Sequence, residues 1–163
     1  MQYLTFASRL GTMLAIAEGN HLLGLYCQDQ ANLPDLSGLT ETGQQRVLHD
    51  VQLQVSEYLS GERQSFTLPF ALNGSRFQQQ VLRQLQRIKL GQTLSYKQVA
   101  MQIGRPQSVR AVANAIARNP LMLLIPCHRV ITSKGQLGGF AAGVQRKQWL
   151  LENEGVRVNT TLK

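Results

Sequence analysis

Three short apolar runs near the start of the chain predict a small β-sheet. Apolar residues gather over 3–7, 12–17 and 22–27, and the polar tetrapeptide E-G-N-H at 18–21 separates the last two runs. Runs of this length bounded by turn-forming residues are typical of strands, and such a tetrapeptide favours a hairpin turn. We therefore predict three strands, of which the second and third form a hairpin.

The apolar period changes to that of a helix after a loop rich in Pro, Gly and Ser that ends near Gly38. Gly61 supplies the helix stop, the run 66–70 predicts one more strand, and 71–75 predicts a linker. We therefore predict a small α/β domain over residues 1–74. The apolar positions at helical spacing are Val47, Leu48, Val51, Val55, Tyr58 and Leu59.

The second half of the chain is predicted to be mostly helical. Apolar residues at helical spacing predict helices over 77–88, 96–103 and 109–116. Ser95 can cap the second of these helices. The tripeptide Gly-Arg-Pro at 104–106 separates the last two. Two short helices joined by a tight turn that contains glycine predict a helix-turn-helix.

The remainder of the chain surrounds an unusual Cys-His pair. The apolar run 121–125 predicts a buried strand that ends at the next proline, and Cys127 and His128 follow in a turn. A glycine-rich loop over 133–143 leads to a last helix over 145–154. Residues 75–163 are thus predicted to form a second, mainly helical domain.

The charge of the chain is strongly one-sided. The first 74 residues carry three Lys or Arg against seven Asp or Glu, whereas the last 89 carry fourteen against two. A net charge of +12 on one small domain is typical of a protein that binds a polyanion, and nucleic acid is the partner it favours. The outer face of the helix over 109–116, with Arg110, Asn114 and Arg118 beside Ala111 and Ala115, is polar and low enough to approach a nucleic-acid groove. An ordinary solvated charged stripe is the alternative for this face.

Length and composition exclude several classes of protein. With 163 residues the chain can bury a core in one or two domains. No apolar stretch approaches the roughly 20 residues of a membrane helix. The first ten residues lack the basic and long apolar regions of a signal peptide, so we predict a cytoplasmic protein without membrane contact. Two cysteines are too few for a disulfide framework.

Cys127 admits four interpretations. Lone cysteines are commonly small buried hydrophobes, as we interpret Cys27. Cys127 instead follows a predicted strand beside His128 and Arg129, where neighbouring cations lower the pKa of a thiol. A zinc site is disfavoured because the two cysteines and three histidines show no paired ligand spacing. A Cys-His hydrolase, which needs an orienting group and an oxyanion hole, and a nucleophile in a DNA-binding domain both stay open on this evidence.

A series of motifs in the second half resembles one family. L-S-Y-K-Q-V-A, I-G-R-P, R-A-V-A-N-A, R-N-P, I-P-C-H-R-V-I and K-x-W-L-L-x-x-E-G follow in order over residues 94–155. In this order they resemble the O6-alkylguanine-DNA alkyltransferases. The resemblance implies an α+β protein with a ribonuclease-H-like domain over 1–74 and a winged helix-turn-helix domain over 75–163. The implied activity is DNA repair by irreversible, stoichiometric transfer of an alkyl group from the O6 atom of guanine, or from O4-alkylthymine, to a cysteine.

The resemblance also implies roles for individual residues. Cys127 matches the nucleophile, and His128 matches the residue that accepts the thiol proton through a water. Glu154 matches the acid that orients this histidine. Asn119 matches the brace of the active-site turn, and Tyr96 matches the hydroxyl that donates to the leaving guanine.

The same resemblance implies duplex DNA as partner, bound in the minor groove by a monomer with the damaged base flipped out, and no cofactor or metal. Arg110 matches the residue that fills the space left by the base. The predicted DNA-contacting residues are Arg110, Ser108, Ala111, Ala113, Asn114 and Tyr96, and the predicted pocket residues are Val130, Phe140, Ala141 and Ala142. The loop G-G-F-A-A-G departs from the family pattern, since Phe140 lacks a hydroxyl and Ala142 can narrow the pocket; we therefore expect weaker acceptance of bulky adducts. A non-catalytic lesion sensor on the same scaffold is the alternative function.

Overall fold

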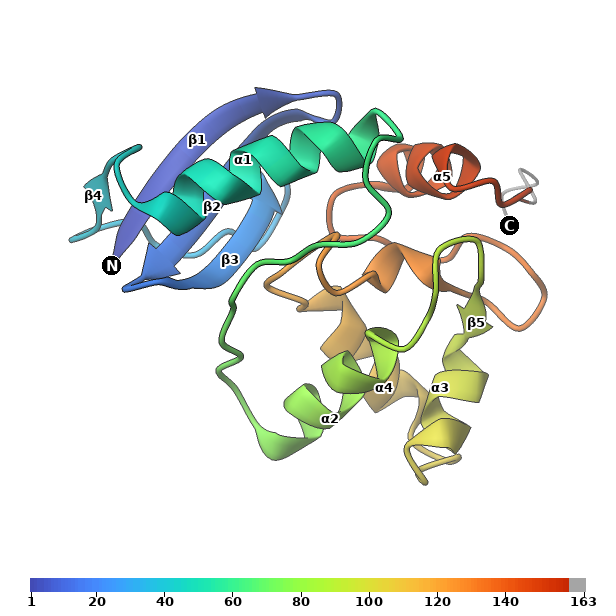
Figure 1. Ribbon diagram of the computed structural model, residues 1–163. Helices are drawn as coiled ribbons and strands as arrows, with labels where there is room; N and C mark the ends of the chain where they lie inside the picture. The colour runs from blue at the N-terminus through green and yellow to red at the C-terminus, as the bar shows by residue number, and fades with distance from the viewer. Residues whose placement is uncertain (159–163) are drawn as a thin grey trace. The chain divides into compact units, whose positions relative to one another are not determined.

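The computed structural model describes residues 1–158. The chain forms two compact units, one over Met1–Asn73 and one beginning at Gly74 (Figure 1). Each unit has its own small sheet, which is accompanied by one helix in the first unit and by several in the second. No helix among residues 1–158 is long and apolar enough to cross a membrane.

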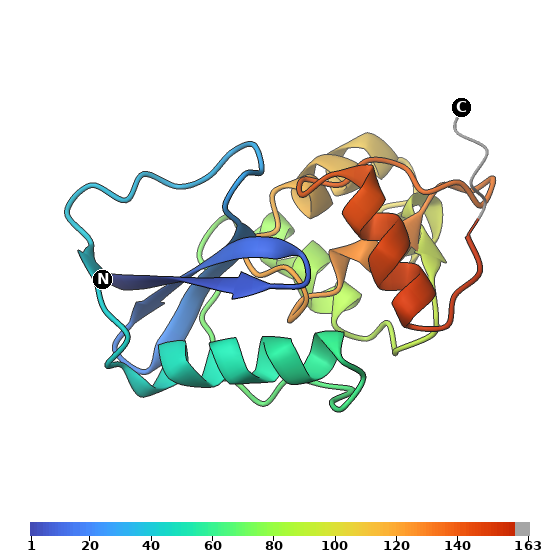
Figure 2. The ribbon, with the colours of Figure 1, turned by 90° about the horizontal axis from the view of Figure 1, so that it is seen from above.

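The first unit is a four-stranded sheet covered on one face by a helix (Figure 2). The strand order is β3-β2-β1-β4, in which β1, β2 and β3 are antiparallel and β4 pairs parallel to β1. The apolar side of α1, which includes Val47, Val51 and Val55, is buried. The elements are β1 (Gln2–Ser8), β2 (Gly11–Glu18), β3 (His21–Cys27), β4 (Thr40–Glu41) and α1 (Arg46–Leu59).

The three predicted strands and the helix of this unit are confirmed, but the strand predicted over 66–70 is wrong. That segment makes only an isolated bridge between Phe70 and Leu22. Leu22 N donates to Pro69 O at 2.9 Å, and Ala71 N donates to Leu22 O at 3.1 Å. A ladder does not extend through Pro69 because proline has no N–H to donate.

Within residues 74–158 the second unit contains four α-helices, one 3-10 helix and a short parallel pair of strands. The helices α2, α3 and α4 pack against one another, and the turn at Gly104, which has φ of 75°, joins the last two into a helix-turn-helix. Ser95 and Gln98 form a reciprocal capping box at the start of α3. Ile88 lies beyond the end of α2, in contrast to the predicted helix over 77–88. The elements are α2 (Arg76–Leu85), β5 (Leu94–Ser95), α3 (Tyr96–Gln102), α4 (Val109–Ala117), the 3-10 helix η1 (Cys127–Arg129), β6 (Val130–Ile131) and α5 (Val144–Asn153).

The strand predicted over 121–125 is also wrong. The segment folds back on itself in a tight turn, with a bridge between Met122 and Ile125. Ile125 N donates to Leu121 O at 2.9 Å. Leu123 is buried at the turn and has φ of 73°, a conformation that is uncommon for any residue but glycine. An apolar run of five residues has the composition of a strand, but its backbone pairs within itself here.

Candidate active site around Cys127

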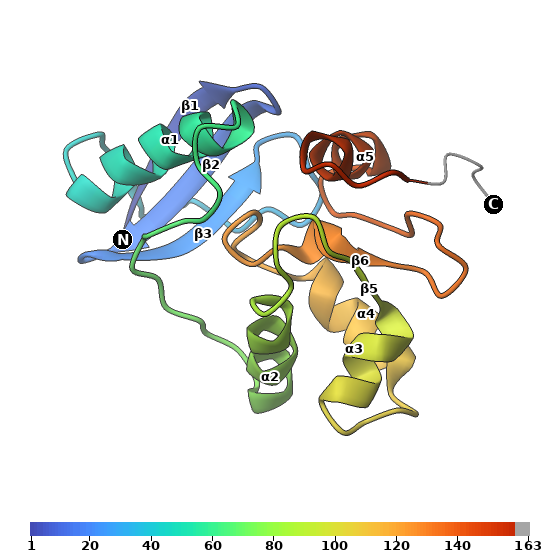
Figure 3. The ribbon, with the colours of Figure 1, turned by 45° about the vertical axis from the view of Figure 1, so that its right-hand side comes forward.

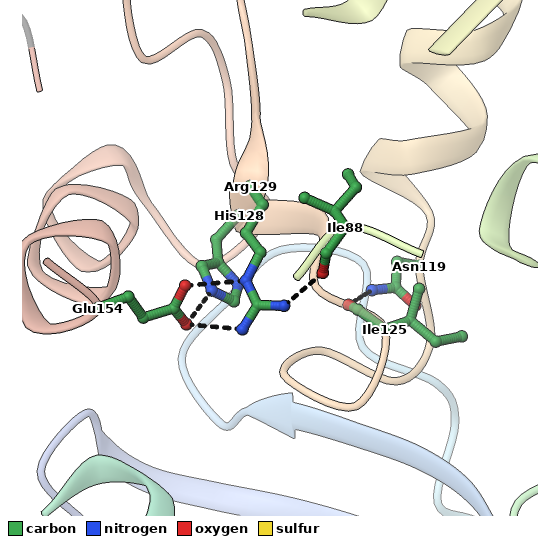
Figure 4. A network of polar contacts seen from close by, with 6 residues as sticks. All are labelled: Ile88, Asn119, Ile125, His128, Arg129 and Glu154. Atoms are coloured by element: carbon green, nitrogen blue, oxygen red, sulfur yellow. Dashed lines mark hydrogen bonds and ion pairs between the residues drawn. The ribbon is translucent and has the colours of Figure 1, made fainter. Parts of the chain in front are cut away.

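Asn119 fixes the turn that precedes Cys127. Its Nδ2 donates to the carbonyl oxygen of Ile125 at 2.8 Å, and its Oδ1 accepts from Leu121 N at 3.0 Å (Figure 4). Cys127 N donates to the same Ile125 carbonyl at 2.7 Å. The side chain of a buried residue therefore holds both ends of the turn, and Cys127 begins the 3-10 helix η1 directly behind it.

The thiol of Cys127 is buried, with 7% of the residue exposed. Burial raises its pKa, while a hydrogen bond from Asn119 and the positive charge of Lys147 act in the opposite direction. The expected lowering of this pKa by the adjacent cations is therefore not observed. Burial outweighs the opposing effects, and the guanidinium of Arg129 is directed at a carboxylate instead of the sulfur.

His128 and Arg129 converge on Glu154 from one turn of η1 (Figure 4). His128 Nε2 lies 2.7 Å from Glu154 Oε2. Arg129 Nε donates to Oε1 at 2.8 Å, and its Nη2 donates to Oε2 at 3.2 Å. Arg129 Nη1 also donates to the carbonyl oxygen of Ile88 at 2.7 Å. The side chains of His128 and Glu154 are 0% and 2% exposed, so this network is shielded from water.

The charges of this network follow from its burial. Burial and the positive charges of Arg129 and Lys147 hold the pKa of His128 well below its usual value, so its imidazole is neutral near pH 7. Burial raises the pKa of Glu154, and the two hydrogen bonds from Arg129 oppose that shift by favouring the carboxylate. Burial lowers the pKa of Arg129 to about 10, which leaves it cationic.

The contact with Glu154 assigns the tautomer of His128. The paired guanidinium of Arg129 favours the carboxylate form of Glu154, and a carboxylate only accepts, so Nε2 carries the proton and Nδ1 carries the lone pair. Within residues 1–158 the buried Nδ1 has no hydrogen-bond partner. The imidazole of His128, the residue after Cys127, thus has one nitrogen bound to an acid and the other free to accept a proton.

Lys147 is a residue of this site that the sequence interpretation missed. It is fully buried in α5, its Nζ donates to Gly139 O at 3.1 Å and lies 3.5 Å from the hydroxyl of Tyr96, and burial lowers its pKa to about 8. Burial and the nearby Cys127 raise the pKa of Tyr96, which keeps the phenol protonated. The motif K-x-W-L-L contained this lysine, but nothing in the sequence indicated that it faces inward.

The glycine-rich loop lies against Tyr96. A Cβ added at Gly138, which has φ of +73°, would lie 3.1 Å from the Tyr96 ring, so only glycine fits there without displacing the phenol. Among the predicted pocket residues, Val130 and Ala142 are buried. Phe140 and Ala141 are half-buried.

The predicted DNA-contacting face of α4 is exposed. Arg110, Ala111 and Asn114 are exposed, as is Arg118 at the end of the helix, and Ala113 is half-buried. Ala115 is buried and therefore does not belong to this face, because it packs on the inner side of α4. The structure also places the half-buried Ser108 at the N-cap of α4, where its side chain makes no capping hydrogen bond.

Residues 1–158 contain no cluster of three or more His, Cys, Asp or Glu arranged to hold a metal ion.

Comparison with known proteins matches both units of the chain. Residues 76–156 match the family model described as "6-O-methylguanine DNA methyltransferase, DNA binding domain", and residues 1–72 match "6-O-methylguanine DNA methyltransferase, ribonuclease-like domain". The chain belongs to the O6-alkylguanine-DNA alkyltransferase family.

Relatives within this family match over almost the whole chain. A methylated-DNA–protein-cysteine methyltransferase of Mycolicibacterium paratuberculosis is 38% identical, with 94% of this chain and 92% of that protein covered. The constitutive enzyme of that name in Bacillus subtilis is 35% identical, with 93% and 94% covered. The crystal structure of Mycobacterium tuberculosis OGT in complex with DNA superposes with a TM-score of 0.89 at 34% identity, over 94% of this chain and 92% of that one.

Proposed function

We propose that this protein repairs DNA by transferring the alkyl group of O6-alkylguanine to the sulfur of Cys127. The observation that carries the proposal is the pairing of His128 with Glu154 at 2.7 Å beside a buried cysteine. This arrangement supplies a neutral base whose second nitrogen is free. The names of the relatives, which are methylated-DNA–protein-cysteine methyltransferases, agree with this chemistry.

The reaction begins with the removal of the thiol proton. His128 Nδ1 accepts this proton through a water molecule, and Glu154 stabilises the resulting imidazolium through Nε2. Arg129 holds Glu154 in place, so that the acid keeps its orientation while His128 changes charge. The thiolate of Cys127 therefore forms only when a substrate is bound and reacts with it.

Alkyl transfer is a single displacement at an sp³ carbon. The sulfur of Cys127 forms a bond to the alkyl carbon while the bond from that carbon to O6 breaks, and the electron pair passes into the guanine. The hydroxyl of Tyr96 donates to the guanine as it becomes anionic, and the raised pKa of this phenol keeps its proton available. The product is a thioether, which none of the neighbouring side chains is equipped to hydrolyse. Each molecule therefore reacts once.

The DNA partner is bound through α4. Its exposed Arg110, Ala111 and Asn114 form a low, basic face that suits close approach to the minor groove. The target atom lies inside a duplex, so the damaged base is flipped out at a cost of a few kcal/mol, and Arg110 fills the vacated space. Contacts to the minor groove and to phosphates distinguish few base pairs, so the preference for a particular DNA sequence is weak. We retain the predictions that the protein is a cytoplasmic monomer.

Bulky adducts are expected to react more slowly than methyl groups. Ala142 is buried in the glycine-rich loop, and we propose that it narrows the predicted pocket. Single-turnover rates on duplexes with O6-methylguanine and O6-benzylguanine test this expectation, and comparable rates contradict it.

The decisive experiment uses an excess of duplex DNA that holds one O6-methylguanine. The masses of the intact protein and of its proteolytic peptides are then measured by mass spectrometry. We expect one added methyl group per chain, confined to the peptide that contains Cys127 and absent from Cys127→Ser. An unmodified protein that binds the lesion tightly would indicate a sensor, and continued turnover would indicate a hydrolase. The same experiment with O4-methylthymine decides whether that base is also repaired.

A further inference from the structure

One side of α2 carries arginines that the proposed function does not use. Arg76 and Arg83 lie seven positions apart on the helix, and Arg87 follows four positions later in the turn behind it. At 100° per residue Arg76 and Arg83 share one side of α2, Arg87 follows beyond the end of the helix, and all three are exposed. The opposite side of α2 is buried through Val81, Leu82 and Leu85. Arg76, Arg83 and Arg87 are referred to below as the α2 arginine row.

The charge of this row is not compensated by the protein. The sequence holds no Asp or Glu between Glu62 and Glu152, and within residues 1–158 none of the three arginines forms an ion pair. Like charges four positions apart repel each other. Arg76 is the first residue of α2, where the helix dipole disfavours a cation. Only Arg83, in the last turn, is placed favourably for helix stability. The stability of the fold therefore does not account for the row.

The spacing of the row suits a phosphate backbone. With a rise of about 1.5 Å per residue, the positions of Arg76 and Arg83 in α2 are about 10.5 Å apart, and Arg87 follows four residues later, beyond the end of the helix. One DNA strand presents a phosphate about every 3.4 Å along the duplex axis, so each flexible arginine can reach a different phosphate.

The row continues into a polar hollow of about 770 Å³ that Arg87 itself lines. Gln84, Gln92, Thr93 and Gln102 also line this hollow with amide and hydroxyl groups, beside Ile88 and Leu94, and Gln84 Nε2 donates to Gln102 Oε1 at 2.6 Å. Such groups contact phosphate and sugar oxygens without reading the base sequence.

The row lies on the side of α2 opposite to Val81, Leu82 and Leu85, and the hollow into which it continues reaches α3 at Gln102. The buried side of α2 is the side that packs against α3 and α4, beside which α2 lies (Figure 3). A duplex that lies along the exposed face of α4 therefore leaves the α2 arginine row free. We propose that this row is a second binding surface for the phosphodiester backbone of duplex DNA, and this inference rests on DNA being the partner of the second unit. Because the hollow lined by Arg87 reaches Gln102 of α3, the backbone is that of the flank of the duplex bound by the helix-turn-helix.

The test compares Arg83→Gln/Arg87→Gln with a matched control, Arg9→Gln/Arg46→Gln, which removes two exposed cations from the first unit. Both pairs are placed in a Cys127→Ser background so that lesion binding is measured at equilibrium. Affinity is measured by fluorescence anisotropy from about 50 to 200 mM salt, on duplexes of about 10 and about 30 base pairs. Bridging of two short duplexes that carry different dyes is measured by energy transfer.

On the long duplex, loss of two phosphate contacts is expected to reduce the slope of log K against log salt by about 1.8, with no change in the control. If the slope changes on the long duplex alone, without bridging, the row binds the flank of the same duplex. If the wild-type arginines bridge two short duplexes and the variant does not, the row binds a second duplex. An unchanged slope without bridging, or an equal change in the control, overturns the proposal. With Cys127 restored, Arg83→Gln/Arg87→Gln is expected to transfer methyl groups on the short duplex at the wild-type single-turnover rate. If neither the variant nor the wild type transfers a methyl group, the proposed function is refuted instead.

Discussion

Replacement of Glu154 by Gln tests the network that orients His128. The amide has nearly the shape of the carboxylate, so packing is preserved and only the charge is lost. In the wild-type protein Arg129 makes two hydrogen bonds to this carboxylate, and its side chain is 8% exposed. In Glu154→Gln the guanidinium stays buried with the Ile88 carbonyl as an acceptor but without a counter-charge.

The expected cost is large because a buried charge loses its partner. Removing one member of a buried ion pair destabilises a protein by about 3–5 kcal/mol. Replacing Arg129 by Met in the same protein removes the unpaired charge and is expected to restore about 2 kcal/mol of that loss. Transfer is expected to slow by about 10²–10⁴-fold, because the anion that stabilises the imidazolium is gone.

Urea denaturation of the two single variants, the double variant and the wild type gives the coupling free energy directly. Glu152→Gln, an exposed position on the same helix, is the matched control and is expected to lie within about 0.5 kcal/mol of the wild type. If Glu154→Gln is no less stable than Glu152→Gln, the carboxylate does not stabilise the buried charge of Arg129. The same conclusion holds if the losses in unfolding free energy of Glu154→Gln and Arg129→Met simply add in the double variant.

Asn119→Ala removes two buried hydrogen bonds from the active-site turn and is expected to cost about 2–4 kcal/mol in urea denaturation, whereas the exposed Asn114→Ala is expected to be nearly neutral. Lys147→Gln removes a charge that lowers the pKa of Cys127, so the pH at which iodoacetamide alkylates this cysteine is expected to rise; an unmoved profile contradicts the role. The depressed pKa of His128 means that the unfolded chain binds a proton below its ordinary value of 6.5 while the folded chain does not. Stability due to this residue is therefore lost as pH falls from 6.5, and the wild type is expected to lose more than His128→Gln between pH 6.5 and 5 in urea midpoints.

Much of the fold could be predicted because local signals agree with the tertiary structure. The apolar runs over 12–17 and 22–27 form strands of the sheet that α1 covers, and Ser95 caps α3 as predicted. The strand predicted over 121–125 was wrong for a physical reason. Its apolar composition predicts that the segment is buried but not whether the backbone is extended or turns. The turn is fixed by the side chain of Asn119, which hydrogen-bonds to both Leu121 and Ile125.

The candidate site was only partly visible in the sequence. The resemblance singled out His128 and Glu154, and the structure brings them to 2.7 Å. Arg129 was interpreted as a neighbour that activates the thiol, but a side chain beside Cys127 in sequence can point elsewhere, and this one binds Glu154. Lys147 lies in a helix among other polar residues, and no periodicity distinguishes a buried lysine from an exposed one.

The same arginine links the chemistry of the site to the integrity of the unit. Arg129 connects the segment after α2, through Ile88, to η1 and to the residue that ends α5, Glu154. Any change in this network therefore alters the free energy of unfolding together with the orientation of His128. A loss of methyl transfer alone cannot separate the two effects. The double variant separates them, since Glu154→Gln/Arg129→Met is expected to recover stability without recovering the acid that His128 needs.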